Sequence, residues 1–339
     1  MLQTRGFETV SPEVIKSIKS YQKSDVLVSL YQVISSVSAF VICYGFLLFS
    51  VKNGYLSALF LSPLASGLAI RVFILQHDCG HGSLFRSQRV NNFVGRLCSL
   101  LTFTPYDHWK KHHSIHHGSW NNVDNRGRLS DLYSDCTTVS EYMSKSRFGK
   151  VIYKISKNPV FTIFIMPPII FFVVYRIAFD TPVAWLRERI GLYVTNICLL
   201  LIYWGLIEIF GLKTVFLVAF SVIYPASVIG VWLFLVQHKF EGVKWASNTG
   251  WNMFDAATGG CSFLKLPSVL KWFSGNIGIH HVHHAAPGIP NYRLNACHEA
   301  HEVFATVKVL NLRDGIREAF TNTLWDEEKS VMVSLRSVR

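Results

Sequence analysis

The sequence is poor in charged residues. Aspartate, glutamate, lysine and arginine make up only 16% of its 339 residues, whereas a typical soluble domain carries about a quarter. Hydrophobic residues account for 50%, and the mean hydropathy is +0.29. This balance argues against an ordinary soluble enzyme and predicts an integral membrane protein. The length fits one helical membrane domain with parts outside the bilayer.

Other common signals are also missing. The seven cysteines are widely spaced and include no Cys-x-x-Cys pair, so we expect reduced, mostly buried thiols rather than a disulfide framework. The first twenty residues contain Glu8, Glu13 and Lys16 and show no basic region followed by an apolar one, so we expect no secretory signal peptide. A His-Pro-Gly-Gly haem motif is absent, and we expect no attached cytochrome domain.

The net charge of +12 raises the question of a nucleic-acid partner. No recognition motif accompanies this charge, and we expect no nucleic-acid binding. Many of the basic residues lie between residues 110 and 157, beside apolar stretches. Such a bias is typical of cytosolic loops that face anionic lipid head groups. It predicts that this segment is cytosolic.

Four apolar stretches reach the length of about 20 residues that a membrane-spanning helix needs. They are residues 26–51, 55–75, 190–210 and 214–236. A fifth stretch, residues 159–175, is shorter and contains Met166-Pro167-Pro168, so we expect it to be interfacial or re-entrant. Arg71 lies near the end of the second stretch, and we expect its side chain to reach the membrane interface.

These stretches predict an all-α integral membrane protein with four transmembrane helices in two hairpins. Two hairpins leave all remaining segments on one side of the bilayer, where we expect a cytosolic helical cap that carries a metal site. We expect a cytosolic N-terminal segment over residues 1–24, a membrane domain over 25–300 and a cytosolic tail over 301–339. Ser11-Pro12-Glu13 predicts a helix start, and residues 298–310 predict an amphipathic helix.

Nine of the 14 histidines form three short clusters. The clusters read His77-Asp78-Cys79-Gly80-His81, His113-Ser114-Ile115-His116-His117 and His280-His281-Val282-His283-His284. Spacings of i, i+4 and i, i+3, i+4 place side chains on one face of a helix. Imidazole is the commonest metal ligand in proteins. We therefore predict that eight of these histidines, all except His281, enclose a metal.

The number of ligands limits the kind of site. Eight nitrogens are too many for one tetrahedral zinc ion, and the first cluster lacks the glutamate of a His-Glu-x-x-His protease. Two metals with four or five nitrogens each fit better, and iron is the choice when a site activates oxygen. His238 follows the last span and is the predicted ninth ligand. We assign supporting or structural roles to His108, His112, His281, His298 and His301.

Ligating histidines usually donate their second N–H group to a carboxylate or a carbonyl. The candidates for this role are Asp78, Asp107, Asp124, Asn252, Asp255 and Asn276. Each of them suits a helix cap or a turn equally well. The sequence alone leaves both roles open for all six.

At this point the motifs resemble those of the membrane fatty acid desaturase superfamily, which has three histidine boxes. The resemblance extends from about residue 55 to residue 300. It rests on HDCGHGSLF at 77–85, WKKHHSIHHGSWNNVDNRG at 109–127, VQHKFEGVKW at 236–245 and GNIGIHHVHHAAPGIPNYRL at 275–294. The surroundings of the third box are most similar to those of bacterial acyl-lipid desaturases of the omega-6 (Δ12) kind.

The resemblance implies an enzyme that introduces a cis double bond into an acyl chain at a non-haem di-iron centre, with O₂ as the oxidant. It also implies an acyl-lipid or acyl-CoA substrate, a ferredoxin or cytochrome b5 electron donor, and histidine boxes on the cytosolic face of a bacterial inner membrane. Carried over to this sequence, the ligands of the two iron ions are His77, His81, His113, His116, His117, His238, His280, His283 and His284. Some relatives have a different second-box spacing, which leaves His112 as an alternative to His113.

Two other functions fit parts of the pattern. A di-iron hydroxylase or ketolase of alkanes, carotenoids or other lipids would use similar boxes. A membrane metal transporter would need a polar path through its spans, but these contain almost no ionisable groups apart from Arg71 and Glu208. We therefore expect a desaturase. Candidates to line its acyl channel are Trp109, Trp120, Trp232 and Trp251.

Overall fold

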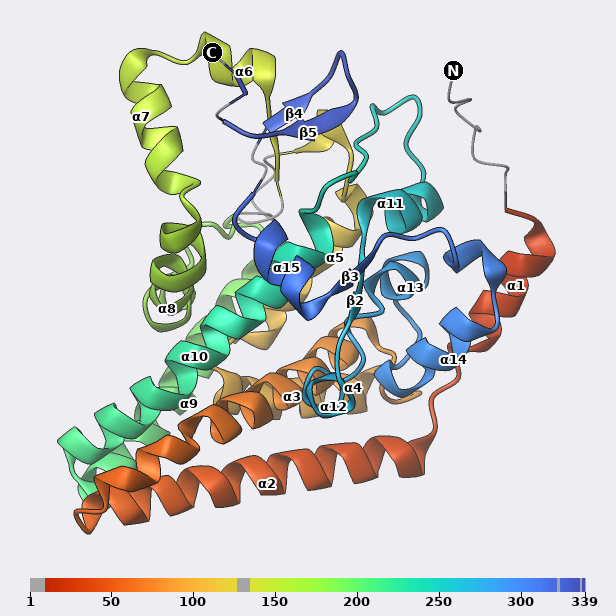
Figure 1. Cartoon of the computed structure of the whole chain (residues 1–339). Helices are drawn as coiled ribbons and strands as arrows, with labels where there is room; N and C mark the ends of the chain where they lie inside the picture. The colour runs from red at the N-terminus through yellow and green to blue at the C-terminus, as the bar shows by residue number, and fades with distance from the viewer. Residues whose placement is uncertain (1–9, 127–134, 322–323, 336, 339) are drawn as a thin grey trace.

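The computed structural model describes residues 10–126, 135–321, 324–335 and 337–338. This part of the chain is mostly helical with little sheet, in agreement with the predicted fold class. Figure 1 shows long helices that converge at one end of the molecule and shorter elements gathered at the other end. Residues 1–9 of the predicted N-terminal segment lie outside the described residues.

Among the described residues, four helical segments are long and apolar enough to cross a membrane. They are α2 (Val26–Lys52), the turn η1 (Leu56–Leu61) with α3 (Ser62–His81), α9 (Leu186–Phe210) and α10 (Leu212–His238). Asp25 caps α2, since its carboxylate accepts hydrogen bonds from the N–H groups of Leu27 and Val28. Helices α3 and α10 run beyond the predicted spans to His81 and His238. Each of them therefore carries clustered histidines at its C-terminal end.

The shorter apolar stretch is irregular, as expected. The π-helical turn η3 (Phe161–Ile165) leads into α8 (Met166–Phe172) and η4 (Val174–Arg176). This segment is bent by 55° relative to α7 (Arg147–Ser156), a geometry that fits a broken span or a re-entrant loop. Pro167 and Pro168 lie in the first turn of α8, where the missing N–H groups cost little.

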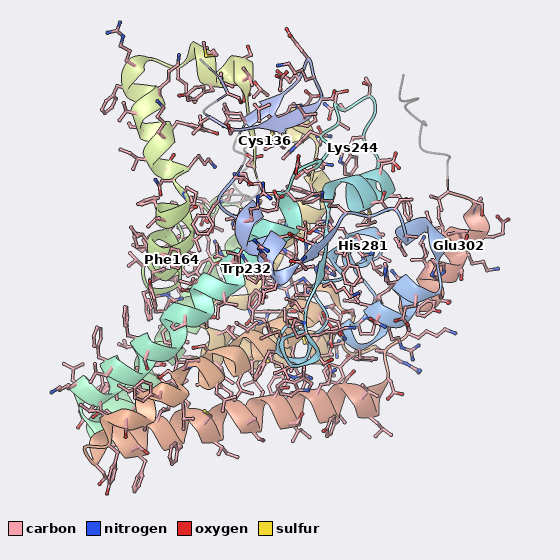
Figure 2. All side chains as sticks on the ribbon, viewed as in Figure 1. Cys136, Phe164, Trp232, Lys244, His281 and Glu302 are labelled. Carbon is pink, nitrogen blue, oxygen red and sulfur yellow. The ribbon has the colours of Figure 1, made fainter. Side chains whose placement is uncertain are left out.

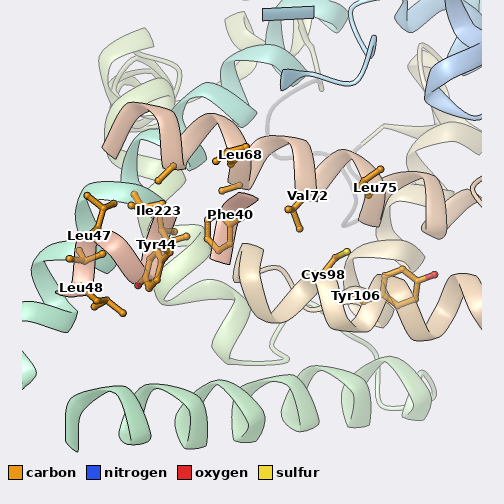
Figure 3. Packing of buried hydrophobic residues seen from close by; sticks show 14 of the residues in the cluster. Phe40, Tyr44, Leu47, Leu48, Leu68, Val72, Leu75, Cys98, Tyr106 and Ile223 are labelled. Carbon is orange, nitrogen blue, oxygen red and sulfur yellow. The ribbon is translucent and has the colours of Figure 1, made fainter. Parts of the chain in front are cut away.

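Helix α3 is the centre of the long-helix layer and packs against α2, α10 and α4 (Gln88–Thr102). Figure 3 shows the buried side chains between these helices, among them Phe40 of α2, Leu68 of α3 and Ile223 of α10. The core continues to Tyr106 at the start of α5 (Tyr106–Ser119). This packing fixes where the histidine-bearing ends of α3, α5 and α10 meet.

Tyr106 links the first two histidine boxes. Its hydroxyl donates a hydrogen bond to the carbonyl of Cys79, at 2.9 Å. Its ring lies against Gly95 of α4, where an added Cβ would be only 2.2 Å from a ring carbon. Only glycine leaves room for this ring, and the ring in turn places α5 beside the end of α3.

We call the shorter elements at the histidine end the cap. Its helices are α1 (Pro12–Ser20), α5, α6 (Val139–Ser144), α11 (Met253–Gly260), α12 (Ser268–Phe273), α13 (His280–Ala285), α14 (Leu294–Glu299) and α15 (Leu312–Glu318). Its turns are η2 (Val123–Asn125), η5 (Asn291–Arg293) and η6 (Glu302–Phe304). Ser11 caps the start of helix α1, as predicted, and its hydroxyl accepts a hydrogen bond from the N–H of Val14.

Two small sheets complete the cap. In one sheet, β1 (Thr137–Thr138) runs parallel to β4 (Leu324–Asp326), which pairs antiparallel with β5 (Val331–Val333). In the other sheet, β2 (Phe263–Lys265) runs parallel to β3 (Val309–Asn311), with Phe263 opposite Val309. The arrangement of the long helices as two hairpins in a bilayer and the cytosolic position of the cap stay predictions.

The prediction for Arg71 is wrong. Its side chain does not reach an interface but is 6% exposed, with the guanidinium 4.0 Å from the centre of the Trp272 ring. Its Nε donates to the hydroxyl of Ser36 at 3.0 Å, and Nη1 donates to the carbonyl of Trp272. Helix α12 covers this part of α3 and supplies the partners that the charge needs.

The predicted amphipathic helix over residues 298–310 is also wrong. Helix α14 ends at Glu299, and the segment finishes in β3. Leu310 is buried while Val309 and Asn311 are exposed. This alternation has the period of a strand, and pairing with β2 satisfies the backbone that a helix would otherwise have satisfied.

Candidate metal centre

The second histidine cluster lies on α5, which presents two neighbouring rows of side chains. Residues four apart share a helix face, so the rows are Trp109, His113, His117 and His108, His112, His116. In the first row Trp109 stacks on His113, with ring centres 4.5 Å apart. In the second row the Nε2 of His116 lies 3.0 Å from the Nε2 of His238. The adjacent residues His116 and His117 therefore point into two different groups of ligands.

The first group contains five histidines, which come from α3, α5 and α13. They are His77, His81, His113, His117 and His283, and one ring nitrogen of each lies within 4.8 Å of all the others. The Nε2 of His117 is 3.2 Å from that of His113 and 3.0 Å from that of His283. Two ligand atoms bound to one metal at about 2.1 Å are separated by about 3.0–3.4 Å. The spacing in this group thus matches a shared metal.

The second group forms around His238 at the end of α10. Its atoms within 4.8 Å of one another come from His238, His280, His284 and Cys261. Three further imidazole nitrogens converge on the Nε2 of His238: those of His116 at 3.0 Å and of His280 and His284 at 3.1 Å each. Together the two groups include all nine histidines that the sequence analysis selected.

The tautomer of His238 tests whether this group fits a metal. Its Nδ1 lies 2.7 Å from the carbonyl of Phe234, and because a carbonyl can only accept, Nδ1 must carry the proton. The Nε2 of the neutral ring is then a bare lone pair that accepts one hydrogen bond, although three imidazole nitrogens face it. A cation shared by these nitrogens satisfies all of them. In the first group, the buried Nε2 of His81 has no hydrogen-bond partner in the described chain, which fits a metal there too.

Burial keeps these imidazoles neutral. Loss of contact with water, reinforced by neighbouring histidines, lowers the pKa well below its ordinary value at His113, His117, His280, His283 and His284. A neutral ring offers the lone pair that a metal requires, whereas a protonated ring offers none. The histidines of both groups therefore offer neutral ring nitrogens to a metal at neutral pH.

Asp78 is the one of the six candidate supporting residues that contacts a clustered histidine in the described chain. Its Oδ1 lies 3.3 Å from the Nδ1 of His77, and its Oδ2 accepts hydrogen bonds from the backbone and side-chain N–H groups of Asn291 at 2.8 and 2.9 Å. It thereby ties the first box to the loop after the third. The other five have different partners. Asp107 pairs with Arg96, and Asp124 accepts a hydrogen bond from the backbone N–H of Asn248. Asn252 and Asp255 cap α11, and Asn276 donates to the carbonyl of Asn291.

The structure also places the remaining histidines. It brings His113 rather than His112 into the first group of ligands. Figure 2 labels His281 within the cap, where its Nε2 lies 2.9 Å from the Nδ1 of His298 rather than in either group. Burial, followed by the effect of His298, lowers the pKa of His281 to about 3. His301 contacts the hydroxyl of Ser17 at 3.0 Å. In the described chain these three histidines lie outside both groups, and their supporting or structural roles stay predictions.

Sequence reasoning missed two residues. The sequence predicts Cys261 only as a buried thiol, but its sulfur joins the second group. No sequence pattern selects Asp180, yet it lies close to both His108 and His112. Neither residue stands near a histidine box in the sequence, so no spacing rule could have found them.

An apolar cavity of about 230 Å³ reaches the histidines. Its apolar walls come from α3, α8, η4 and α10, and include Ala69, Ile70, Phe73, Ile74, Ile170, Phe171, Val174, Ile223, Ala226, Gly230, Val231, Leu233 and Phe234. His77, His113, His116 and His280 border the same space. Of the four candidate tryptophans, Trp109 lines this cavity. Trp120 instead packs on His238, with ring centres 4.4 Å apart. The cavity can hold part of an acyl chain next to the ligands.

Comparison with known proteins agrees with this arrangement. A family model described as fatty acid desaturase matches residues 53–311, which is more than half of the chain. The chain belongs to the fatty acid desaturase family. This desaturase is 36% identical over 327 residues to a fatty acid desaturase of Bacillus subtilis (strain 168), with 96% of this chain and 91% of the relative covered. The resemblance inferred from the histidine boxes is thus confirmed.

Two more distant relatives have names that state an activity. The desaturase is 25% identical over 276 residues to an sn-1 oleoyl-lipid 12-desaturase of Picosynechococcus sp., with 78% of this chain and 73% of the relative covered. It is 24% identical over 292 residues to an sn-1 acyl-lipid omega-3 desaturase (ferredoxin) of Synechocystis sp., with 82% and 77% covered. These names describe the relatives, and they guide the proposal below.

Proposed function

We propose that this desaturase introduces a cis double bond into the acyl chain of a membrane lipid at a di-iron centre, using O₂ and electrons from a separate ferredoxin or cytochrome b5. The observation that carries the proposal is the convergence of nine histidines, in two groups, beside an apolar cavity. The proposed ligands are His77, His81, His113, His116, His117, His238, His280, His283 and His284. The acyl-lipid substrate is supported by the names of the two cyanobacterial relatives.

The overall reaction converts –CH₂–CH₂– to –CH=CH– and reduces O₂ to two molecules of water with two electrons and two protons from outside the chain. A methylene group offers no acidic proton and no leaving group, so side chains alone cannot remove its hydrogens. When bound, the iron ions supply the oxygen activation that this step needs.

The residues of the chain itself hold and orient the reactants. Phe73, Phe171 and Phe234 line the cavity, and each buried methylene of a substrate gains about 0.8 kcal/mol by leaving water. The cavity wall also keeps water away from the reacting carbons. Asp78 and the Phe234 carbonyl contact the Nδ1 atoms of His77 and His238, which leaves each Nε2 free for a metal.

We propose in addition that the cap faces the cytosol. The basic segment between residues 110 and 157 supports this orientation. Cysteines introduced at exposed Asn53 and Thr249 test it, since the first lies between α2 and α3 and the second lies in the cap. A membrane-impermeant maleimide should label N53C on intact cells and T249C only after the cells are opened. The reverse pattern would refute the orientation.

Expression in a host that lacks polyunsaturated lipids tests the reaction. Mass spectrometry with double-bond location should find a new double bond in the host lipids under aerobic conditions with an electron donor present. A matched control is Ser114→Ala, an exposed change on α5, which should keep the activity, whereas His116→Ala should lose activity and iron. No new double bond with the wild-type protein would refute a desaturase, and an oxygenated lipid instead would indicate a hydroxylase. Two bound irons and full activity in H116A would refute His116 as a ligand.

A further inference from the structure

A third group of potential metal ligands lies beside the histidine cluster. His108 and His112 are one turn apart on α5, and Asp180 lies in the loop between η4 and α9. One ring nitrogen of each histidine and one carboxylate oxygen of Asp180 lie within 4.8 Å of one another. None of the three belongs to the nine ligands proposed above.

The distances in this group resemble those in the cluster. The Nε2 of His108 is 3.0 Å from Oδ1 of Asp180, and the Nε2 of His112 is 3.8 Å from Oδ2. Ligands bound at about 2.1 Å are about 3.0 Å apart at octahedral angles and about 3.4 Å apart at tetrahedral angles. The first distance already fits, and the second exceeds the tetrahedral separation by about 0.4 Å.

The surroundings hold both rings in place and leave one side open. His108 is 3% exposed and His112 is 8% exposed. The rings of Tyr175 and Trp185 pack edge-on against them, at 5.8 and 5.6 Å between ring centres. All three members of the group border the apolar cavity that reaches the cluster. Any ion between them would therefore have free coordination positions on the cavity side.

The carboxylate of Asp180 faces both imidazoles. One of its oxygens lies 3.0 Å from His108, and the other lies 3.8 Å from His112. Two imidazoles and one carboxylate with open positions form a ligand set that suits divalent transition metals.

We propose that His108, His112 and Asp180 bind one divalent transition metal ion, Zn²⁺ or Fe²⁺, at a site separate from the nine-histidine centre. The ion has one negative charge among its protein ligands. Its open positions take oxygen ligands from the cavity, either water or the polar end of a bound lipid. The site depends on α5 and the loop before α9, and it does not depend on the reaction proposed above.

Metal content of the full-length protein in detergent tests the site. Wild type, Asp180→Asn and His108→Asn are equilibrated with Zn²⁺, dialysed and measured by inductively coupled plasma mass spectrometry. A matched control is Asp107→Asn, which removes a buried carboxylate from the same helix. Asp107 pairs with Arg96 and does not belong to the proposed site. We expect D180N and H108N each to hold one metal equivalent less than wild type and D107N. His112 is left unchanged because it is also the alternative to His113 in the cluster.

A second measurement does not depend on the variants being folded. Crystals of the wild-type protein grown with Zn²⁺ should give an anomalous difference peak at the zinc edge between His108, His112 and Asp180. Equal metal content in wild type, D180N and H108N, or the absence of that peak, would overturn the proposal and leave a hydrogen-bonded group without metal. Loss of metal from the nine-histidine centre alone affects neither comparison, so the two proposals fail separately.

Discussion

Gly230 allows the role of the cavity to be tested quantitatively. It lies on α10 in the cavity wall, and a Cβ added there would meet no atom within 4 Å. Side chains at this position therefore extend into the space proposed for the acyl chain instead of displacing protein. Alanine should displace about one methylene of substrate, which is worth about 0.8 kcal/mol, and leucine about four, worth about 3 kcal/mol. Since about 1.4 kcal/mol corresponds to a factor of ten, kcat/KM should fall about 4-fold in G230A and on the order of 100-fold in G230L.

The assay is the initial rate of double-bond formation in membranes, per amount of folded desaturase, with acyl lipids of several chain lengths. A control for leucine in a long helix is Gly205→Leu, since Gly205 lies on α9, is exposed and has no atom within 4 Å of an added Cβ. G205L should behave like wild type. Shorter acyl chains should recover part of the rate in G230L because they need less of the cavity.

The reasoning fails if G230L and G205L both keep rates within about twofold of wild type, a difference of only about 0.4 kcal/mol. The acyl chain would then lie elsewhere, and the cavity beside the histidines would not be the substrate site. Equal loss of activity for all chain lengths, with a lower melting temperature, would likewise show that the substitution damaged the fold rather than the site.

Three further predictions concern the metal and the fold. Asp78→Asn weakens the support of His77, so metal affinity should fall about 10–100-fold, and an unchanged metal content after dialysis against a chelator would contradict this. The clustered histidines outside the long helices have lowered pKa values when folded, so the unfolded chain takes up more protons just below pH 6.5. Stability of the metal-free protein should therefore fall as the pH drops from 7 to 5, by up to about 1.4 kcal/mol per group and pH unit; a melting temperature that stays constant over this range would refute it. Arg71→Ala leaves the Ser36 hydroxyl and the Trp272 carbonyl without their donor, and thermal unfolding in detergent should show a loss of about 2–4 kcal/mol, whereas less than about 0.5 kcal/mol would mean that solvent replaces the arginine.

The features that could be predicted from the sequence are those set by local periodicity. A run of about 20 apolar residues identifies a long helix whatever surrounds it, and the four predicted stretches match α2, α3, α9 and α10 within a few residues at most ends. Spacing of i, i+3, i+4 identifies histidines on one face, and the structure brings the nine selected histidines together. His238 was found because it ends a span rather than because of a motif.

The features that could not be predicted depend on contacts between distant segments. The partners of Arg71 are Ser36 and Trp272, and the latter is 201 residues away. Asp180 meets His108 across 72 residues, and β3 forms only because β2 is available for pairing. In each case the local sequence admits a reasonable alternative, and a tertiary partner decides between them.

The two rows of α5 connect these observations. Successive residues on a helix differ by about 100°, so His112 and His113 cannot face the same group. His113 and His117 face the first group, while His116 contacts His238 in the second. The row that ends at His116 continues back through His112 to His108, where it meets Asp180. Because one turn of helix rises about 5.4 Å, a metal held there would lie about one to two turns from the second group, on the same backbone and beside the same cavity. His112 makes the ligand assignment of the second box ambiguous in the sequence. In the structure it lies between His116 of the second group and the proposed third metal site.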